Sequence, residues 1–327
     1  MVRAVLALAA VACCLAAGPV RGERGLVDVG GTPQTLFAGQ GSLWVLTCDR
    51  GCTGEGRHAE GRLVRIDPRS ARVVASGSLS RPGTAAIGGK SLYVTDFWRD
   101  TVRRIDLRSL RVVRALRLRL PFRFSPRDNA FVPEAVAAGR HAVWVVTDRG
   151  ALARADLQLK RVVATLRLPA DAFGDPEGGI AAGDGTVWLA ESLAGVYRVD
   201  PRRNRIIARI RLPRFDATEV IRCGGNVLVL GVRTSGGALT ARYELARIDL
   251  PRNSARIVSR LRAGPVEMTC GAEFVWLARP QGSTLERIDP GSGRLLERRR
   301  ARIGTDLAFA AGHLWTTFPD GTVRQLR

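Results

Sequence analysis

Short runs that alternate apolar and polar residues follow one another from about residue 25 to the end of the chain. In residues 112–120, for example, the apolar positions interleave with Arg114, Arg117 and Arg119. This period of two predicts strands that bury one face, whereas an amphipathic helix would repeat its apolar positions every three to four residues. Gly, Asp and Pro separate the runs and predict turns between them. The chain is therefore expected to be all-β.

A first segment recurs seven times: a small residue and a glycine, a turn, and then an apolar run that carries an aromatic residue or, once, a leucine. This marker residue stands at Trp44, Tyr93, Trp144, Trp188, Leu228, Trp276 and Trp315. Successive markers are 49, 51, 44, 40, 48 and 39 residues apart. Four short strands with their turns need this length, so the period predicts the blades of a β-propeller.

A second segment, Arg–apolar–Asp followed by a polar turn and an apolar pair, trails each of the first six. Its acidic residue stands at Asp67, Asp106, Asp156, Asp200, Asp249 and Asp289. Asp favours a turn because its carboxylate accepts a hydrogen bond from the backbone two residues on. The seventh unit ends one strand short, while residues 25–30 resemble a last strand with no unit before them. We therefore predict a seven-bladed β-propeller of four-stranded antiparallel blades, its last blade closed by the N-terminal strand at about 25–30, which hides the sheet edges.

Two repeats also contain motifs of a known family. Tyr93-Val94-Thr95-Asp96 is close to a YVTN motif, and Trp188-Leu189-Ala190-Glu191 is similar to the aromatic–apolar–small–acid segment of streptogramin lyases. The chain thus resembles the bacterial extracytoplasmic YVTN and streptogramin-lyase-like seven-bladed propellers over about residues 25–327. The resemblance implies ligand binding on the top face, where the second-to-third and fourth-to-first strand connections open. Its motifs mark blades and not an activity, since one fold hosts many functions.

The first residues have the features of an export signal. Arg3 precedes the apolar stretch 4–17, which is too short to span a bilayer comfortably. We divide the chain into an export signal peptide at 1–22 and a single propeller domain at 23–327. We expect a monomer that is secreted or associated with the cell envelope. Residues 10–13 loosely resemble a lipoprotein signal, so anchoring through a lipid on Cys13 is the less favoured alternative.

Four cysteines follow the leader, and export to an oxidising compartment permits disulfides. Cys48 and Cys52 bound a short loop and are expected to form one. Cys223 and Cys270 stand where other repeats carry alanine. They are either small buried thiols or, because their blades are adjacent, a second disulfide, and the sequence leaves both open.

The charge is strongly positive: 51 Lys and Arg stand against 30 Asp and Glu, a formal charge of +21. All the basic residues except Lys90 and Lys160 are Arg. Arg alternates along the predicted outer strands, where charge discourages edge-to-edge pairing. An isoelectric point near 11.4 is also typical of nucleic-acid binding, but the predicted export disfavours that partner. Anionic envelope polymers or lipid headgroups suit the same positive field.

Long connections on the predicted top face form the first candidate site, because loops longer than a turn requires are often functional. They lie at 48–61, 120–133 and 233–242. The middle one is rich in Phe and Arg, and further aromatic residues are expected beside it. The candidate ligand-binding residues are Phe97, Trp98, Arg99, Phe122, Arg123, Phe124, Phe131 and Phe173. They suit a planar, anionic or carbohydrate-like ligand or a protein partner, or else they seal the loop onto the barrel as a hydrophobic plug.

Acidic or amide residues open the first predicted strand of every repeat except the second. They are Gln34, Glu134, Glu177, Glu219, Glu267 and Asp306, and the alignment shifts by one residue at Glu177, Glu267 and Asp306. Around the mouth of the central channel, the five carboxylates could hold a divalent cation or orient a basic ligand. Alternatively, each caps a turn or pairs with an Arg from a neighbouring blade.

The case for catalysis is weaker. The streptogramin lyases use a His with an acid and a magnesium ion, but His58, His141 and His313 match no such position, and the last two fall in turns on the opposite face. No hydrolase elbow, zinc-protease helix motif or phosphate loop is present in the sequence. Glu191 could act as an acid–base residue, but a solvated strand end is the simpler interpretation.

We therefore interpret the protein as an exported, non-catalytic binding or scaffolding propeller that recognises a ligand or an envelope protein through its top face. No cofactor is expected beyond the divalent cation that the channel mouth could bind. The alternative is a streptogramin-lyase-like or other metal-assisted propeller enzyme that uses the channel-mouth carboxylates.

Overall fold

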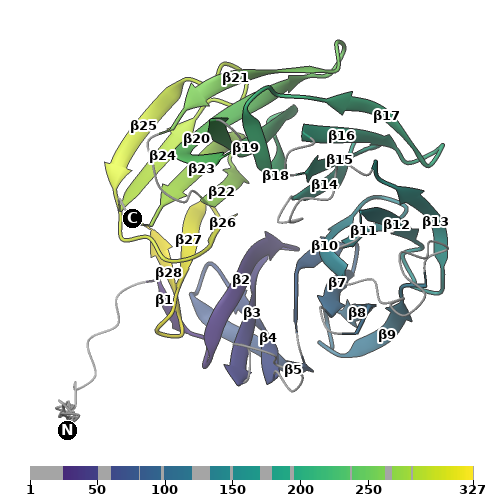
Figure 1. Ribbon diagram of the computed structural model, residues 1–327. Helices are drawn as coiled ribbons and strands as arrows, with labels where there is room; N and C mark the ends of the chain where they lie inside the picture. The colour runs from purple at the N-terminus through teal and green to yellow at the C-terminus, as the bar shows by residue number, and fades with distance from the viewer. Residues whose placement is uncertain are drawn as a thin grey trace, which may run out of the picture.

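The computed structural model describes residues 25–50, 60–80, 82–96, 99–119, 133–147, 150–169, 179–191, 195–235, 238–261, 267–280 and 283–326. These residues form seven four-stranded antiparallel sheets, which stand as blades in a ring (Figure 1). The described residues contain no helix, so the predicted all-β, seven-bladed propeller is confirmed. Accordingly, no helix that could cross a membrane is found among them.

Each blade presents its first strand to the ring axis and its fourth strand to the outside (Figure 1). The first strands are β2 (Thr32–Gly39), β6 (Ala85–Gly88), β10 (Pro133–Ala138), β14 (Ile180–Gly183), β18 (Phe215–Cys223), β22 (Glu267–Gly271) and β26 (Leu307–Ala310). The second strands are β3 (Ser42–Arg50), β7 (Ser91–Asp96), β11 (Val143–Thr147), β15 (Thr186–Glu191), β19 (Asn226–Ser235), β23 (Phe274–Arg279) and β27 (His313–Phe318). The third strands are β4 (Glu60–Asp67), β8 (Thr101–Asp106), β12 (Ala151–Ala155), β16 (Gly195–Asp200), β20 (Ala238–Asp249), β24 (Thr284–Ile288) and β28 (Thr322–Leu326). The fourth strands are β5 (Arg72–Ser80), β9 (Val112–Arg117), β13 (Val162–Arg167), β17 (Arg205–Ile210), β21 (Ser254–Arg260), β25 (Leu295–Arg300) and, from the N-terminus, β1 (Leu26–Asp28).

The N-terminal strand closes the ring as predicted. β1 pairs antiparallel with β28, with Val27 opposite Val323. Backbone hydrogen bonds extend this pairing, since Val29 N donates to Gly321 O at 3.0 Å. The seventh blade is thus built from both ends of the propeller, which leaves no unpaired edge at the junction.

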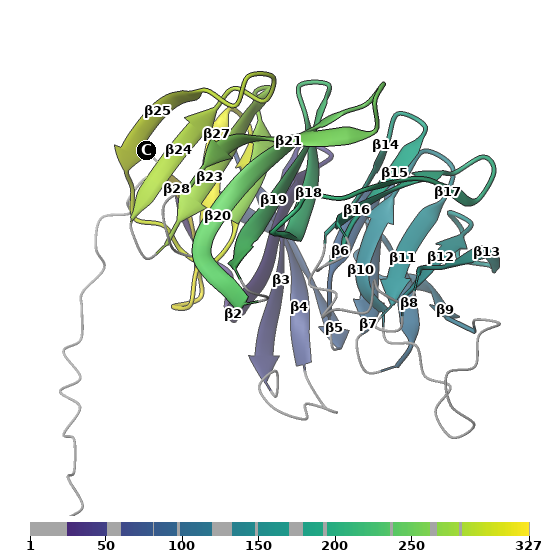
Figure 2. The ribbon, with the colours of Figure 1, turned by 45° about the horizontal axis from the view of Figure 1, so that its top comes forward.

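Antiparallel pairing divides the connections between two faces. The second-to-third and fourth-to-first connections lie on one face, the top face, and the remaining turns lie on the other, the bottom face. Residues 233–242, predicted as a long loop, are instead an extension of the β19–β20 ladder, in which Ser235 faces Ala238. Figure 2 shows β20 as a long, curved strand beside β19.

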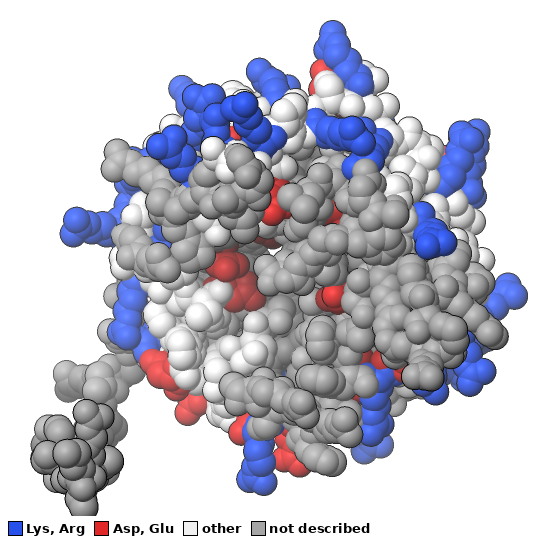
Figure 3. All heavy atoms as spheres, in the orientation of Figure 1, with Lys and Arg blue, Asp and Glu red and all other residues white. Residues whose placement is uncertain are grey.

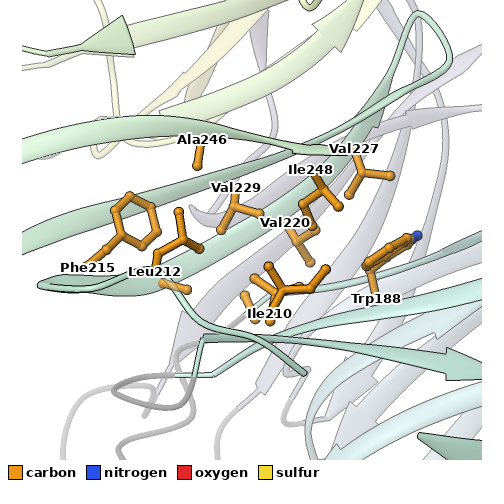
Figure 4. Packing of buried hydrophobic residues seen from close by; sticks show 12 residues of the cluster. Trp188, Ile210, Leu212, Phe215, Val220, Val227, Val229, Ala246 and Ile248 are labelled. Atoms are coloured by element: carbon orange, nitrogen blue, oxygen red, sulfur yellow. The ribbon is translucent and has the colours of Figure 1, made fainter. Parts of the chain in front are cut away.

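Neighbouring blades pack through apolar residues of both. Figure 4 shows the cluster between the fourth and fifth blades, where Trp188 and Ile210 of one meet Val220, Val227 and Ile248 of the other. The marker aromatic residues are buried in such clusters, since Trp44, Trp144, Trp188 and Trp315 are all 1% exposed or less. The seven markers therefore define the core between blades.

The Arg of the Arg–apolar–Asp motif joins one blade to the next. The Arg198 guanidinium lies 5.3 Å from the Trp188 ring centroid, a cation–π distance. Its Nη1 donates to Leu250 O at 3.0 Å and to Asn253 Oδ1 at 2.7 Å in the turn of the following blade. Arg154 repeats this arrangement one blade earlier. Part of the arginine excess is thus structural.

A disulfide joins Cys223 of the fifth blade to Cys270 of the sixth, with 5.4 Å between the Cα atoms. The comparison of the repeats predicts that both cysteines occupy the position where other blades carry alanine, and this prediction is wrong for Cys223. Cys223 pairs with the first residue of β19, just as Gly39 pairs with the first residue of β3. This position comes one residue after the alanine position. In the first two blades the same diagonal contact is made by Gly39 and Ile87, so the cysteines meet where adjacent blades already touch.

The other cysteine and terminal predictions lie partly outside the described residues. Cys48 is buried on β3 and disulfide-bonded, but its predicted partner Cys52 is not among the described residues, nor is the predicted signal peptide with Cys13. The Cys48–Cys52 disulfide and the export signal therefore remain predictions.

Candidate functional site at the channel mouth

Carboxyl groups gather where the first strands begin on the top face, around the ring axis; we call this region the channel mouth. It contains Glu134 on β10, Glu219 on β18, Glu267 on β22 and Asp306 just before β26. In Figure 3 acidic atoms surround the central opening, whereas Lys and Arg lie mainly toward the outer edge. A strongly basic protein thus has an acidic centre on this face.

Strand register brings three of these acids into equivalent places. In each blade, one residue of the first strand pairs with the marker residue of the second strand. Glu219, Glu267 and Asp306 each stand two residues before that position. Glu134, like Gln34, instead occupies a bulge one position earlier. The predicted alignment of Glu219 with Gln34 and Glu134 is therefore wrong. The correction makes the fifth, sixth and seventh blades a continuous arc of equivalent carboxyls.

The three carboxyls of this arc, Glu219, Glu267 and Asp306, resist ionisation. Burial foremost, together with the charges of Glu267 and Asp306, raises the pKa of Glu219 to about 8. Burial and the neighbouring Asp306 charge raise the pKa of Glu267 to about 7. Because like charges lie close together with little water, the arc holds protons near neutral pH.

Asp306 is also part of the ring closure. Its Oδ2 accepts a hydrogen bond from Leu36 N at 2.6 Å in the first blade, and its Oδ1 accepts one from Leu307 N at 2.7 Å. Burial raises its pKa to about 6, while these two donors act in the opposite direction. Asp306 therefore has a structural function that Glu219 and Glu267 lack.

The two glutamates of the arc differ from Glu286 in their charged partners. Within the described part of the chain, neither Glu219 nor Glu267 has an Arg or Lys at ion-pair distance. Elsewhere the fold pairs its buried acids: Glu286 accepts hydrogen bonds from Arg279 at 3.0 Å and from Arg298 at 2.8 Å. Within the described part of the chain, the predicted pairing with a neighbouring Arg is therefore not observed for Glu219 and Glu267.

A second acidic pair lies across the third and fourth blades. Glu191, the last residue of β15, is only 1% exposed, so its interpretation as a solvated strand end is wrong. Burial raises its pKa to about 8, with the Glu134 charge adding to the shift. Its Oε2 has no hydrogen-bond partner among the described residues. Sequence reasoning missed this environment because burial at a strand end depends on the adjacent blade.

The aromatic part of the predicted site is not tested. Arg99 lies in an exposed turn after β7, where its N–H donates to Asp96 O at 3.2 Å. The remaining members lie outside the described residues; they are Phe97, Trp98, Phe122, Arg123, Phe124, Phe131, Phe173 and Glu177. The loop therefore stays a prediction.

Metal binding requires several donor side chains grouped around one point. Among the described residues, no three His, Cys, Asp or Glu side chains are grouped closely enough to hold a metal ion. His141 and His313 lie at first-to-second strand turns on the bottom face, as predicted. Within the described chain, the arc is thus arranged as neighbouring carboxyls and not as a metal cage.

Comparison with known proteins supports the fold. No protein-family model and no curated protein sequence matches the chain. BamB from Moraxella catarrhalis is similar in structure, with 16% identity, a TM-score of 0.57, and coverage of 92% of this chain and 85% of that one. Kuenenia stuttgartiensis hydrazine synthase has 12% identity, a TM-score of 0.68, and coverage of 95% and 99%. The Myceliophteria thermophila Cps50 (Swd1) β-propeller domain has 12% identity, a TM-score of 0.63, and coverage of 90% and 96%. At these identities the likeness shows the propeller fold alone.

Proposed function

We propose that this protein is an exported, non-catalytic binding or scaffolding propeller whose top face recognises a basic group of a ligand or of an envelope protein. One observation carries the proposal: among the described residues, no Lys or Arg pairs with Glu219 or Glu267, although the full sequence has 51 basic residues. A protein so rich in Arg could pair these acids, as it pairs Glu286.

The physical argument rests on the energy of partly buried carboxyls. A carboxylate removed from water costs free energy unless a cation or hydrogen-bond donors compensate it. An ammonium or guanidinium group from a partner would supply that compensation at the channel mouth. Binding would then displace protons from the arc, so affinity should increase as the pH rises through about 6 to 8, the range of the three pKa values.

Two further features support an extracytoplasmic setting. The Cys223–Cys270 disulfide suits an oxidising compartment, and residues 1–22 have the composition of an export signal. The repeat motifs support placing the chain near the YVTN and streptogramin-lyase-like propellers. The solved neighbours, among them BamB and Swd1 propellers, support the fold on which the proposed site stands.

A tetralysine peptide is a sharp probe because the protein as a whole repels it. We expect calorimetric titration at pH 8 to detect binding, and the isosteric double variant Glu219→Gln/Glu267→Gln to weaken it about tenfold through loss of charge-assisted contacts. The matched control, Glu273→Gln/Glu297→Gln, removes equal charge from acids away from the arc and should bind like the wild type. Absence of binding to the wild type, or an equal loss in the control, would refute the proposal.

The aromatic loop needs its own variant. Replacing residues 121–131 by a Gly-Ser linker should weaken tetralysine binding. The metal-assisted enzyme uses the same carboxyls, and titration with Mg²⁺ or Ca²⁺ separates the two functions. Divalent-ion binding that disappears in Glu219→Gln/Glu267→Gln, without tetralysine binding to the wild type, would favour the enzyme.

A further inference from the structure

A cavity of about 550 Å³ opens on the bottom face between the third and fourth blades. Its walls are three turns: residues 139–142 after β10, residues 183–186 between β14 and β15, and Pro201 with Arg202 after β16. All these residues belong to the described chain. The cavity is separate from the channel mouth because the turns of the two faces lie at opposite ends of the strands.

The cavity has a structural origin in small side chains. At most blade junctions, a side chain on the first strand of one blade approaches the glycine at the end of the first strand in the preceding blade. A Cβ built on Gly39 would lie 2.6 Å from Ile87 Cδ1, and Phe309 similarly crowds Gly271. Between the third and fourth blades the corresponding contact is only Ala182, 3.7 Å from a Cβ on Gly139. This junction therefore leaves space that others fill.

The cavity walls are rich in positive charge. Arg140, Arg154 and Arg202 line it together with His141, and its one acidic lining residue, Asp184, is already ion-paired with Arg222 of the fifth blade. Free positive charge therefore exceeds free negative charge in the cavity.

The three arginines differ in how they are held. Arg154 is fixed, since its Nη1 donates to Pro201 O at 2.8 Å and to Asn204 Oδ1 at 2.7 Å. Arg140 and Arg202 are exposed turn residues on facing blades. Among the described residues, neither side chain has a hydrogen-bond or ion-pair partner. The geometry therefore provides two available guanidinium groups beside one fixed group.

We infer that this cavity binds a small soluble polyanion that presents two or more carboxylate or phosphate groups to Arg140 and Arg202. Guanidinium groups recognise such planar or tetrahedral oxyanions through paired N–H donors. The volume falls within the range of small-molecule sites, about 300 to 1,000 Å³. The inference does not depend on the proposed function, because its residues, face and ligand charge are all different.

Citrate and inorganic pyrophosphate test the site directly. We expect calorimetric titration of the wild type at constant ionic strength to show binding of at least one of them. The double variant Arg140→Gln/Arg202→Gln should bind that anion about tenfold more weakly, the effect of losing charge-assisted hydrogen bonds. Circular dichroism and the thermal midpoint without anion should match the wild type, since both residues are exposed.

A matched control separates the cavity from general attraction to a basic protein. Lys90→Gln/Arg69→Gln removes the same charge from the equivalent bottom-face turns of the second and first blades, which do not line this cavity. The control should bind citrate or pyrophosphate like the wild type. Equal weakening in both double variants, or no binding of either anion to the wild type, would overturn the inference.

Discussion

The channel mouth and the bottom-face turns place carboxyl groups in opposite environments. In the turns, hydrogen bonds from backbone N–H groups lower the pKa of Asp200, those of Arg202 foremost, and the Ser109 N–H donates to Asp106 Oδ1 at 2.8 Å. At the mouth, burial raises the pKa of Glu219 and Glu267. These turn carboxylates thus accept hydrogen bonds within their own turns, whereas Glu219 and Glu267 have no ion-pair partner among the described residues.

The interior shows the same contrast between two buried glutamates. Glu286 is 2% exposed and lies between Arg279 and Arg298, while Glu191 is 1% exposed and faces the like charge of Glu134. Burial alone therefore does not decide the state of an acid in this protein. The partners supplied by the strands decide it.

The largest effect is expected from Glu286→Gln. The substitution leaves the buried Arg279 guanidinium without its counter-charge, so the free energy of unfolding should decrease by about 3 kcal/mol. Urea denaturation at pH 7 measures this loss. Glu297→Gln, an acid on the outer strand, is the control and should change little. A Glu286 variant as stable as the wild type would show that the ion pair contributes nothing to the fold.

The opposite sign is expected from Glu191→Gln. The folded pKa of about 8 exceeds the ordinary value of 4.5, so the folded state holds a proton that the unfolded state releases between these pH values. Wild-type stability should therefore fall as the pH rises from 4.5 to 8. The Gln variant lacks this loss and should be more stable than the wild type at pH 9 by a few kcal/mol, but not at pH 4.5.

Urea denaturation of both proteins at pH 4.5, 7 and 9 measures this difference. Glu134→Gln should reproduce a smaller part of the gain, because it removes the neighbouring charge but not the burial. A Glu191→Gln variant that is less stable than the wild type at pH 9 would contradict the uncompensated state of Glu191.

A smaller loss is expected from Asp306→Ala. The variant leaves the Leu36 and Leu307 N–H groups without their acceptor at the ring closure, which should cost about 2 kcal/mol. Asp306→Asn keeps one acceptor oxygen and should lose less. Urea denaturation at pH 7 compares them, and equal stability of Asp306→Ala and the wild type would remove the structural function assigned to this residue.

The smallest effect is expected from Asp106→Ala in a bottom-face turn. Hydrogen bonds, first from the Ser109 backbone, lower the pKa of Asp106 below 3.8. Its stabilising contribution should therefore be present at neutral pH and disappear as the pH falls through the folded pKa. Thermal denaturation at pH 7 should show a modestly lower midpoint temperature for the variant than for the wild type. At pH 3 this difference should be smaller. A midpoint difference that is larger at pH 3 than at pH 7 would contradict the assignment of Asp106 as a carboxylate stabilised by hydrogen bonds.

Much of the fold could be predicted from the sequence because the repeat is carried by local chemistry. The markers such as Trp44 and Trp188, and the turn acids such as Asp67, report strands and turns directly. The number of blades and the closure by residues 25–30 follow from counting incomplete units. Each of these signals lies within one blade.

The candidate site could be predicted only in part, because it depends on register and on contacts between blades. The bulge at Thr218 gives Glu219 the register of Glu267 and not that of Glu134. No pattern of residues in the sequence predicts this bulge. The burial of Glu191 and the meeting of Cys223 with Cys270 likewise depend on a neighbouring blade. The presence of carboxyl groups at the channel mouth could therefore be predicted from the sequence. Which of these carboxyl groups lie in equivalent positions could not.

The central claim is that Glu219 and Glu267, which have no ion-pair partner among the described residues, are available to a basic group. Carbon-13 NMR of glutamate side-chain carboxyls tests it, with Glu219→Gln and Glu267→Gln to assign the two resonances. We predict that these resonances titrate near pH 8 and 7 in the free protein, and that saturating tetralysine lowers both values. Titration near 4.5 in the free protein, or no change on adding the peptide, would contradict the account.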